Sequence, residues 1–343
     1  MNDTAVAQGA APDEAELIRL MDYPDSTEEI PTLDIADYLA GKPGAKAAVA
    51  EQLGEITRTI GFFYLKGHGI PRDFIDHVFA ESRRFHGQPL AVKKEVPLND
   101  NVGYRHEELQ KDLDTDNVNL IAKAKPDLLS TLTMVRPLDK DATQFMNKEL
   151  KPQPFVWPTG LPGFKETMLD YQSRIEALGK KFLPLWAISL DLPENYFEPF
   201  FKAPQVTLQL LQYSPQSAVG NKQYGIAPHT DNAMMTFLAQ SNVPGLAVRM
   251  PSGHWRMVDI RPDTLLVNTG NVICRWTNDR YLSTKHRVIN RSGIERYSIP
   301  VFFGPDDDAV VETVPTCVEP GQSPRYEPRT YLWLRRWYYG YAN

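Results

Sequence analysis

Cysteine, excess basic charge and long apolar runs are all scarce in this chain of 343 residues. Its two cysteines, Cys274 and Cys317, cannot form a disulfide framework, and so low a count fits the reducing cytoplasm. The formal net charge of −6 offers no basic surface to a nucleic acid. No run approaches the roughly 18 apolar residues of a membrane helix, and the acidic N-terminus does not resemble a secretory signal. We therefore expect a cytoplasmic protein with neither nucleic acid nor membrane as partner.

Apolar residues, in contrast, are plentiful, because 42% of the chain is hydrophobic. This content can build one large core. We expect residues 1–29, which are polar and acidic, to form a loosely ordered arm, and residues 30–343 to form a single domain. Within that domain we distinguish a helical N-terminal portion (30–204), a core (205–314) and a closing segment (315–343).

Hydrophobic periodicity predicts the elements of the N-terminal portion. Apolar residues at steps of three and four indicate helices, and short aromatic or β-branched runs indicate strands. The predicted strands are Ile30–Ile35 and Phe62–Leu65, and the predicted helices are Ala45–Ile60, Pro71–Phe85 and Phe164–Leu190. Between Pro89 and Pro162 the sequence is rich in Asp, Asn, Lys and Pro, which predicts an irregular connection of the kind that is often functional.

From Gln205 onward, short strand-like runs are separated by Gly, Pro and Asn turns, a spacing typical of an antiparallel sandwich or jelly roll. A segment dense in Trp and Tyr, Thr330–Tyr339, predicts a closing helix. The fold class is therefore α+β with a mainly β core. The predicted strands are Gln205–Tyr213, Met234–Ala239, Leu246–Met250, Trp255–Asp259, Thr264–Asn268, Thr284–Ile289, Arg296–Phe303 and Val310–Val314.

A candidate metal site lies in Ile226-Ala-Pro-His-Thr-Asp231. On a strand, residues two apart point to the same face, so His229 and Asp231 project together. Such a pair alone is common by chance, but His286, in a second strand-like run, supplies a third ligand. Two histidines and one carboxylate leave other metal positions open, which suits non-haem Fe(II) oxygen chemistry.

A candidate anion site follows ten residues after His286. In the predicted strand from Arg296 to Phe303, Arg296, Ser298 and Phe302 share one face by the period of two. A guanidinium and a hydroxyl two residues apart can bind a carboxylate, with the Arg in a bidentate contact. No acidic residue in the same strand could neutralise Arg296, so an external anion is indicated.

With these motifs, the chain resembles the Fe(II)/2-oxoglutarate-dependent oxygenases, in the branch of isopenicillin N synthase and the plant flavonoid, gibberellin and alkaloid oxygenases. The resemblance extends from about Ile30 to the C-terminus and implies a double-stranded β-helix (jelly roll) core with helical decoration. The motifs that carry it are Ile30-Pro-Thr-Leu-Asp34, Gly61-Phe-Phe-Tyr-Leu-Lys-Gly-His-Gly-Ile-Pro71, Trp157-Pro158, Leu161-Pro-Gly-Phe164, Gln212-Tyr-Ser-Pro215, His229-Thr-Asp231, Gly253-His-Trp255, Asn268-Thr-Gly270, His286-Arg-Val288 and Arg296-Tyr-Ser298.

The resemblance also implies cofactors and an activity. It places Fe(II) on His229, Asp231 and His286, and it places the distal carboxylate of 2-oxoglutarate on Arg296, Ser298 and Tyr213. With O2 as oxidant and ascorbate as a candidate reductant, decarboxylation of 2-oxoglutarate would drive hydroxylation, desaturation or cyclisation of a small organic substrate.

Four residues are candidate substrate contacts. Gln209 shares a strand face with Tyr213, Asn232 directly follows the metal pair, and Phe302 lies on the face of Arg296. Tyr104 belongs to the irregular connection, which in the resembling family arches over the iron. We expect these residues to line a mostly apolar pocket in a monomer or weak homo-oligomer.

Three alternatives remain open at this level. An oxidase of the same fold that does not use 2-oxoglutarate could hold its own substrate's carboxylate on Arg296 and Ser298. A jelly-roll protein could bind a ligand without catalysis, although such a protein would often lose one of the three ligands. A zinc hydrolase could use the same three ligands, but the adjacent carboxylate anchor would have no obvious role.

Overall fold

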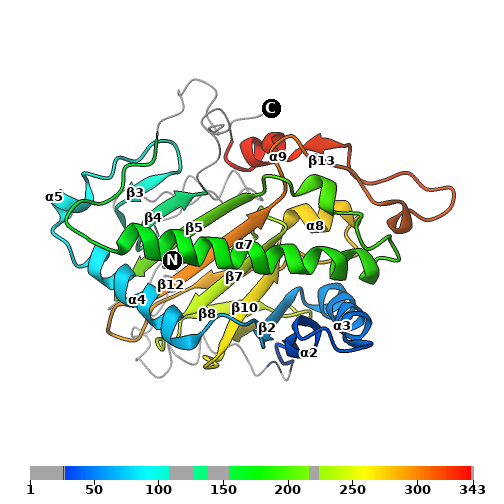
Figure 1. Ribbon diagram of the computed structural model, residues 1–343, viewed down its shortest axis with the longest axis horizontal. Helices are drawn as coiled ribbons and strands as arrows, with labels where there is room; N and C mark the ends of the chain where they lie inside the picture. The colour runs from blue at the N-terminus through cyan, green and yellow to red at the C-terminus, as the bar shows by residue number, and fades with distance from the viewer. Residues whose placement is uncertain (1–25, 27, 108–126, 137–153, 216–223, 341–343) are drawn as a thin grey trace, which may run out of the picture.

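The computed structural model describes residues 26, 28–107, 127–136, 154–215 and 224–340 (Figure 1). Its described strands form sheets of eight, four and two strands, so the mixed α+β class with a mainly β core is confirmed. Most of the predicted acidic arm lies outside these residues. No helix of the described ranges is long and apolar enough to cross a membrane.

The large sheet has the strand order β1-β2-β10-β7-β12-β5-β4-β3. The β1–β2 pair is parallel and the other neighbouring pairs are antiparallel. Its strands are β1 (Thr32–Asp34), β2 (Phe62–Lys66), β10 (Thr264–Thr269), β7 (Met235–Gln240), β12 (Arg296–Gly304), β5 (Gln205–Tyr213), β4 (Leu129–Val135) and β3 (Gly103–Arg105).

The second sheet has the order β6-β11-β8-β9, and a short two-stranded sheet, β13–β14, lies beside the C-terminal helix. All pairs in both are antiparallel. The strands are β6 (Ile226–His229), β11 (His286–Val288), β8 (Leu246–Arg249), β9 (Trp255–Met257), β13 (Val310–Val311) and β14 (Arg329–Thr330).

One face of the large sheet, called here the outer face, is covered by helix α7 (Phe164–Ser189). Figure 1 shows α7 crossing the sheet, with α3 and α4 beside it. The ring of Phe182 on α7 lies 6.4 Å from Phe63 and 5.9 Å from Phe237, measured between ring centroids. A Cβ at Gly179 would lie 2.8 Å from the ring of Phe303, so glycine permits this close approach. These aromatic contacts bury the outer face.

The remaining helices are shorter than α7. Helix α4 also packs on the outer face, where it contacts β5 and β12. The helices are α2 (Ala36–Leu39), α3 (Ala45–Thr59), α4 (Arg72–His86), α5 (Leu90–Lys93), α8 (Asn271–Trp276) and α9 (Tyr331–Tyr338), with 3-10 turns η2 (Glu198–Phe200) and η3 (Pro315–Cys317).

The opposite, inner face is set by the register of the strands. Phe302 of β12 pairs with Thr236 of β7, which pairs with Asn268 of β10, and paired residues share a face. At steps of two residues along β12, Pro300 and Ser298 lie on the same face. The inner face therefore carries polar side chains among apolar ones, unlike the aromatic outer face.

The prediction of an irregular connection between Pro89 and Pro162 was partly wrong. It contains β3, helix α5 and the seven-residue strand β4, which is buried except at Val135. Strand β4 has the sequence Leu-Ser-Thr-Leu-Thr-Met-Val, and its hydroxyl side chains disguise the apolar alternation that normally identifies a strand. The short helix α8 was also not expected.

Candidate metal and carboxylate site

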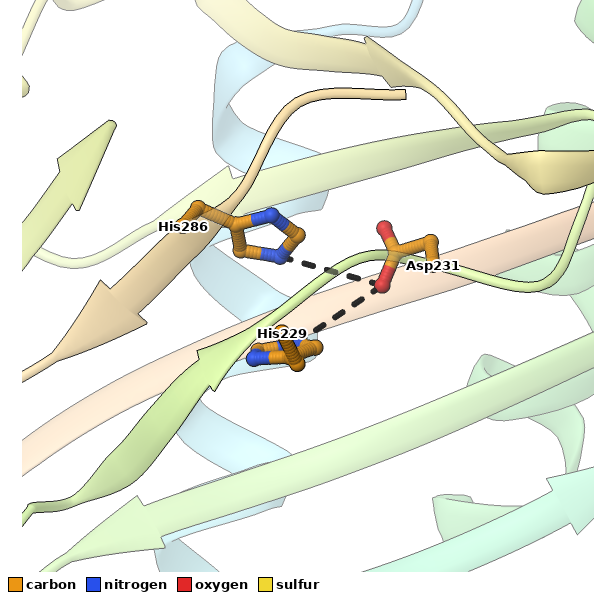
Figure 2. Close-up of side chains that lie close together, drawn as sticks. All are labelled: His229, Asp231 and His286. Carbon is orange, nitrogen blue, oxygen red and sulfur yellow. Dashed lines mark ion pairs between the residues drawn. The ribbon is translucent and has the colours of Figure 1, made fainter. Parts of the chain in front are cut away.

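Two histidines are brought together by the pairing of β6 with β11. His286 and His229 are register partners, and their ring centroids lie 4.2 Å apart. Asp231 lies two residues after His229, just beyond the end of β6. Figure 2 shows the two imidazoles and the carboxylate converging on one point. The structure therefore brings together the three residues that the strand-period argument and the resemblance identified.

The distances within this group fit a shared metal ion. The Nε2 atoms of His229 and His286 lie 3.8 Å and 3.7 Å from Oδ1 of Asp231. Each residue offers one ligand atom, and the three atoms lie within 4.8 Å of one another. Asp231 and His286 are buried, whereas His229 is partly exposed. Among the described residues, these three side chains form the group of His, Cys, Asp or Glu that could hold a metal ion.

The ligand atoms are oriented by hydrogen bonds from outside the group. Nδ1 of His229 lies 2.8 Å from the carbonyl of Ala227, and Nδ1 of His286 lies 3.2 Å from that of Thr284. If each Nδ1–H donates to its carbonyl, both Nε2 lone pairs face the centre. The edge of the Phe62 ring also packs against His286, at 5.3 Å between centroids.

The carboxylate of Asp231 is held at one oxygen only. Its Oδ2 accepts hydrogen bonds from Thr236 Oγ1 at 2.6 Å and from Asn268 Nδ2 at 2.7 Å. Burial alone raises the pKa of Asp231, but His286 and His229, then Asn268 and Thr236, lower it more, so the net pKa is lowered. Oδ1 is thereby left as an ionised ligand that faces the two histidines.

The loop around Asp231 is also fixed through its backbone. Its carbonyl accepts the amide hydrogen of Asn271 at 2.7 Å, and a Cβ at Gly270 would lie 2.8 Å from the same carbonyl oxygen. The C-terminal helix binds the loop as well. Tyr338 donates to the carbonyl of Thr230 at 2.8 Å, and Asn232 donates to the carbonyl of Leu334 at 3.4 Å.

The predicted carboxylate anchor forms a second group, on neighbouring strands of the large sheet. Arg296 of β12 and Tyr213 of β5 are register partners, and Ser298 follows on the same face. Ser298 donates to Tyr213 Oη at 3.2 Å, and Nη1 of Arg296 lies 3.4 Å from Ser298 Oγ. The guanidinium also lies over the Tyr213 ring, 4.8 Å from its centroid.

This anchor is buried and incomplete. Arg296, Ser298 and Tyr213 are each 1% exposed, and Nε of Arg296 has no hydrogen-bond partner among the described residues. Burial lowers the pKa of Arg296 and raises that of Tyr213, yet an Arg guanidinium stays charged in proteins. No carboxylate of the described residues forms an ion pair with it. A buried cation of this kind requires an anionic ligand.

Glycines permit close packing against the anchor. A Cβ at Gly245 would lie 3.1 Å from Cδ of Arg296, and a Cβ at Gly225 would lie 2.8 Å from Cδ1 of Tyr213. Larger residues at these two positions would displace the anchor side chains.

The predicted substrate contacts lie in different places. Gln209 and Phe302 are on the inner face, and Gln209 donates to Thr133 Oγ1 of β4 at 3.2 Å. Asn232 binds the backbone of α9. Tyr104 instead lies on the outer face, where its ring is 5.6 Å from that of Phe85 on α4. It is therefore on the opposite side of the sheet from the two groups.

Two further buried histidines, His68 and His86, have structural partners. Nδ1 of His68 accepts the amide hydrogen of Ile70 at 3.2 Å. His86 is buried, with Nε2 3.2 Å from the carbonyl of Leu210. Burial lowers the pKa of His86 to about 3, which keeps it neutral.

Two contributors to the site were not singled out from the sequence. They are Thr236 and Tyr338, which hold the metal loop from a neighbouring strand and from the C-terminal helix. Asn268, in contrast, carried a signal as a polar residue in the Asn268-Thr-Gly270 motif. The roles of Thr236 and Tyr338 depend on tertiary contacts, which local periodicity does not reveal.

Comparison with known proteins gives consistent matches along the chain. The family model for the 2OG-Fe(II) oxygenase superfamily matches residues 205–305, and that for the N-terminal region of non-haem dioxygenases in morphine synthesis matches residues 30–160. A "2-oxoglutarate-Fe(II) type oxidoreductase" of Emericella nidulans is 34% identical over 88% of this chain and 86% of that protein. A soybean (Glycine max) homoarginine-6-hydroxylase is 30% identical over 84% of this chain and 88% of its own length.

A solved structure is also similar. It is the crystal structure of a full-length Neurospora crassa protein in complex with alpha-KG and thymine, with a TM-score of 0.79 and 28% sequence identity. The match covers 93% of this chain and 99% of that one.

Proposed function

We propose that His229, Asp231 and His286 hold the iron of this chain, which belongs to the 2-oxoglutarate- and Fe(II)-dependent oxygenase superfamily. The protein is an enzyme, a dioxygenase that uses Fe(II) and couples the oxidative decarboxylation of 2-oxoglutarate to the oxidation of a substrate. Iron and 2-oxoglutarate, when bound, supply the activation of O2. The part of the chain is to bind, orient and shield them.

At the metal, the two Nε2 atoms and Oδ1 of Asp231 would be the protein ligands. The hydrogen bonds at Nδ1 of each histidine fix the ring orientation, and those at Oδ2 of Asp231 favour binding through one oxygen. Such outer contacts typically change metal affinity or activity by about 10- to 100-fold. Three ligands on one side leave the other positions of the metal for co-substrate, O2 and water.

At the anchor, we propose that Arg296 binds the distal carboxylate of 2-oxoglutarate together with Ser298 and Tyr213. The observation that carries this assignment is the fully buried Arg296, whose Nε has no partner among the described side chains. A carboxylate there would neutralise the guanidinium and accept from both hydroxyls. Because all three side chains are shielded from water, each contact is stronger than it would be at the surface.

For the substrate, we propose a small organic molecule next to the metal, bounded by Gln209 and Phe302 of the inner face and by Asn232. Hydroxylation is the default outcome, with desaturation or cyclisation as alternatives. The relatives support a small molecule but not one chemical class, since they include a hydroxylase of homoarginine, an amino acid, and a protein solved in complex with thymine, a neutral base.

We also propose that residues 30–343 form a single domain with portions 30–204, 205–314 and 315–343. We propose further that the protein is a monomer or weak homo-oligomer, lies in the cytoplasm and uses ascorbate as reductant.

Anaerobic titration tests the proposed function. Fe(II) added to the apo-protein should bind one ion per chain, and 2-oxoglutarate should then produce the weak visible charge-transfer band of a keto acid chelated to Fe(II). Exposure to O2 should yield succinate. Iron binding without the band at any 2-oxoglutarate concentration would contradict the anchor assignment and leave the metal assignment intact.

A further inference from the structure

The short strand β3 places an arginine on the face that carries the active site. Arg105 pairs with Thr131 of β4, which pairs with Leu211 of β5, and Leu211 pairs with Ser298 of β12. Since paired residues share a face, Arg105 lies on the same inner face as the anchor. Its neighbour Tyr104 points the other way, onto α4.

Arg105 is half-buried, and its hydrogen-bond partner is neutral. Its Nη2 donates to Oδ1 of Asn101 at 2.8 Å, an amide oxygen that carries no charge. No ion pair joins it to a carboxylate in the described parts of the chain. Among other partly buried arginines, Arg136 pairs with Glu176 at 3.1 Å and Arg335 with Asp307 at 2.5 Å, whereas Arg275 and Arg280 donate to backbone carbonyls. Arg105 therefore presents a positive charge without a matching acid among the described residues.

The inner face between Arg105 and the anchor carries polar groups. Thr131 and Thr133 of β4 are buried, at 7% and 5% exposed, and Gln209 of β5 binds Thr133. These three side chains and Arg105 are called the polar strip. Buried hydroxyls and an amide around a guanidinium suit an oxygen-rich ligand group, and they depart from the mostly apolar pocket expected from the sequence.

The C-terminal helix lies against the metal loop. Tyr338 binds the carbonyl of Thr230, and Tyr339 follows directly, with its ring 5.3 Å from that of Tyr338. Burial raises the pKa of the Tyr339 phenol.

The charges of the proposed iron site do not require Arg105. Fe(II) and Arg296 together carry as much positive charge as 2-oxoglutarate and Asp231 carry negative charge. We propose, resting on the function proposed above, that Arg105 binds a carboxylate of the substrate. The substrate class is thus a small carboxylic acid whose anionic end lies on β3 and whose reacting end lies at the metal.

Matched pairs of acids and amides test this class directly. Phenylacetate, indole-3-acetate and L-proline would each be compared with the corresponding primary amide. Binding is measured anaerobically, as the change in the visible band of the Fe(II)–2-oxoglutarate complex, and turnover as succinate formed. We expect at least one acid to bind at least about tenfold more tightly than its amide, because the amide loses a charge-assisted contact.

Arginine variants identify the responsible residue. Arg105→Gln should weaken the preferred acid by about 10- to 100-fold and leave its amide unchanged. Arg105→Lys should keep part of the affinity, because it keeps the charge but loses the planar fork. Arg174→Gln, which removes a surface charge on α7, is the matched control and should change neither.

The same measurements separate this inference from the proposed function. The visible band of the 2-oxoglutarate complex should form equally in Arg105→Gln and in the native protein, since Arg105 is not part of the anchor. If no acid in the set is preferred over its amide, or if Arg105→Gln keeps the full preference, the inference is overturned. Absence of the band in the native protein would instead contradict the function proposed above.

Discussion

The metal group and the carboxylate anchor differ in how completely other protein groups provide their hydrogen bonds and balance their charges. Every ligand of the metal group has an outer hydrogen bond: Asp231 from Thr236 and Asn268, and the histidines at carbonyl oxygens. In the anchor, the guanidinium of Arg296 contacts a hydroxyl and an aromatic ring, and its Nε has no described partner. The metal group is thus held in place by the protein, whereas the proposed anchor holds a buried positive charge that no described carboxylate neutralises.

This difference predicts that the two groups can be disabled separately. Removing a residue from the metal group should affect iron first. Removing Arg296 should affect an anion and leave iron in place. Three substitutions test whether the two groups are independent. Loss of a metal ligand should have the largest effect, and loss of an outer hydrogen bond the smallest.

Replacement of a metal ligand should have the largest effect. His286→Ala removes one of three ligands and should lose most Fe(II) binding, and with it the 2-oxoglutarate band and succinate formation. Anaerobic Fe(II) titration measures this directly. His254→Ala, at an exposed position, is the matched control and should bind one iron per chain. Full-strength iron binding by His286→Ala would show that the third ligand is misassigned.

Replacement of the anchor should separate the two groups. Arg296→Leu should weaken 2-oxoglutarate by about 10- to 100-fold, because a shielded charge-assisted contact is lost, while iron stays bound. Arg296→Lys should fall between this variant and the native protein. The visible band, titrated with 2-oxoglutarate at saturating Fe(II), gives both affinities. Equal loss of iron in Arg296→Leu would mean that the two groups are not independent.

Replacement of an outer contact should have the smallest effect. Thr236→Val keeps the shape of the side chain but removes the hydroxyl that donates to Oδ2 of Asp231, so Fe(II) affinity should fall by about tenfold. The affinity for 2-oxoglutarate, measured at saturating iron, should change little. A variant with native iron affinity would indicate that Asn268 alone orients the carboxylate.

The parts of the site that could be predicted from sequence are those set by local periodicity. Arg296 and Ser298 are two residues apart on one strand, so the period of a strand was enough to place them together. The same spacing predicted that Asp231 lies beside His229, although Asp231 lies just beyond the end of β6. Tertiary contacts are not visible locally. For that reason Thr236 was not identified as a partner of Asp231, although it is only five residues away.

Strand β3 is a second case in which local sequence did not identify the residue that faces the site. The resemblance draws attention to Tyr104 as a substrate contact, whereas the register places Arg105 on the inner face. A shift of one residue reverses which side chain faces the site. Only the pairing of β3 with β4 shows whether Tyr104 or Arg105 faces the site. Strand β4 was itself not predicted, because hydroxyl side chains interrupt its apolar pattern.

The contact between α9 and the metal loop has a consequence for the order of folding. Tyr338 lies 108 residues after Thr230 in the chain, and Leu334 lies 102 residues after Asn232. During synthesis, the loop that carries His229 and Asp231 therefore emerges long before the helix that holds it. Contacts so distant in sequence form late, because a long loop must close first. Stable iron uptake should accordingly wait until α9 has emerged from the ribosome and packed on this loop.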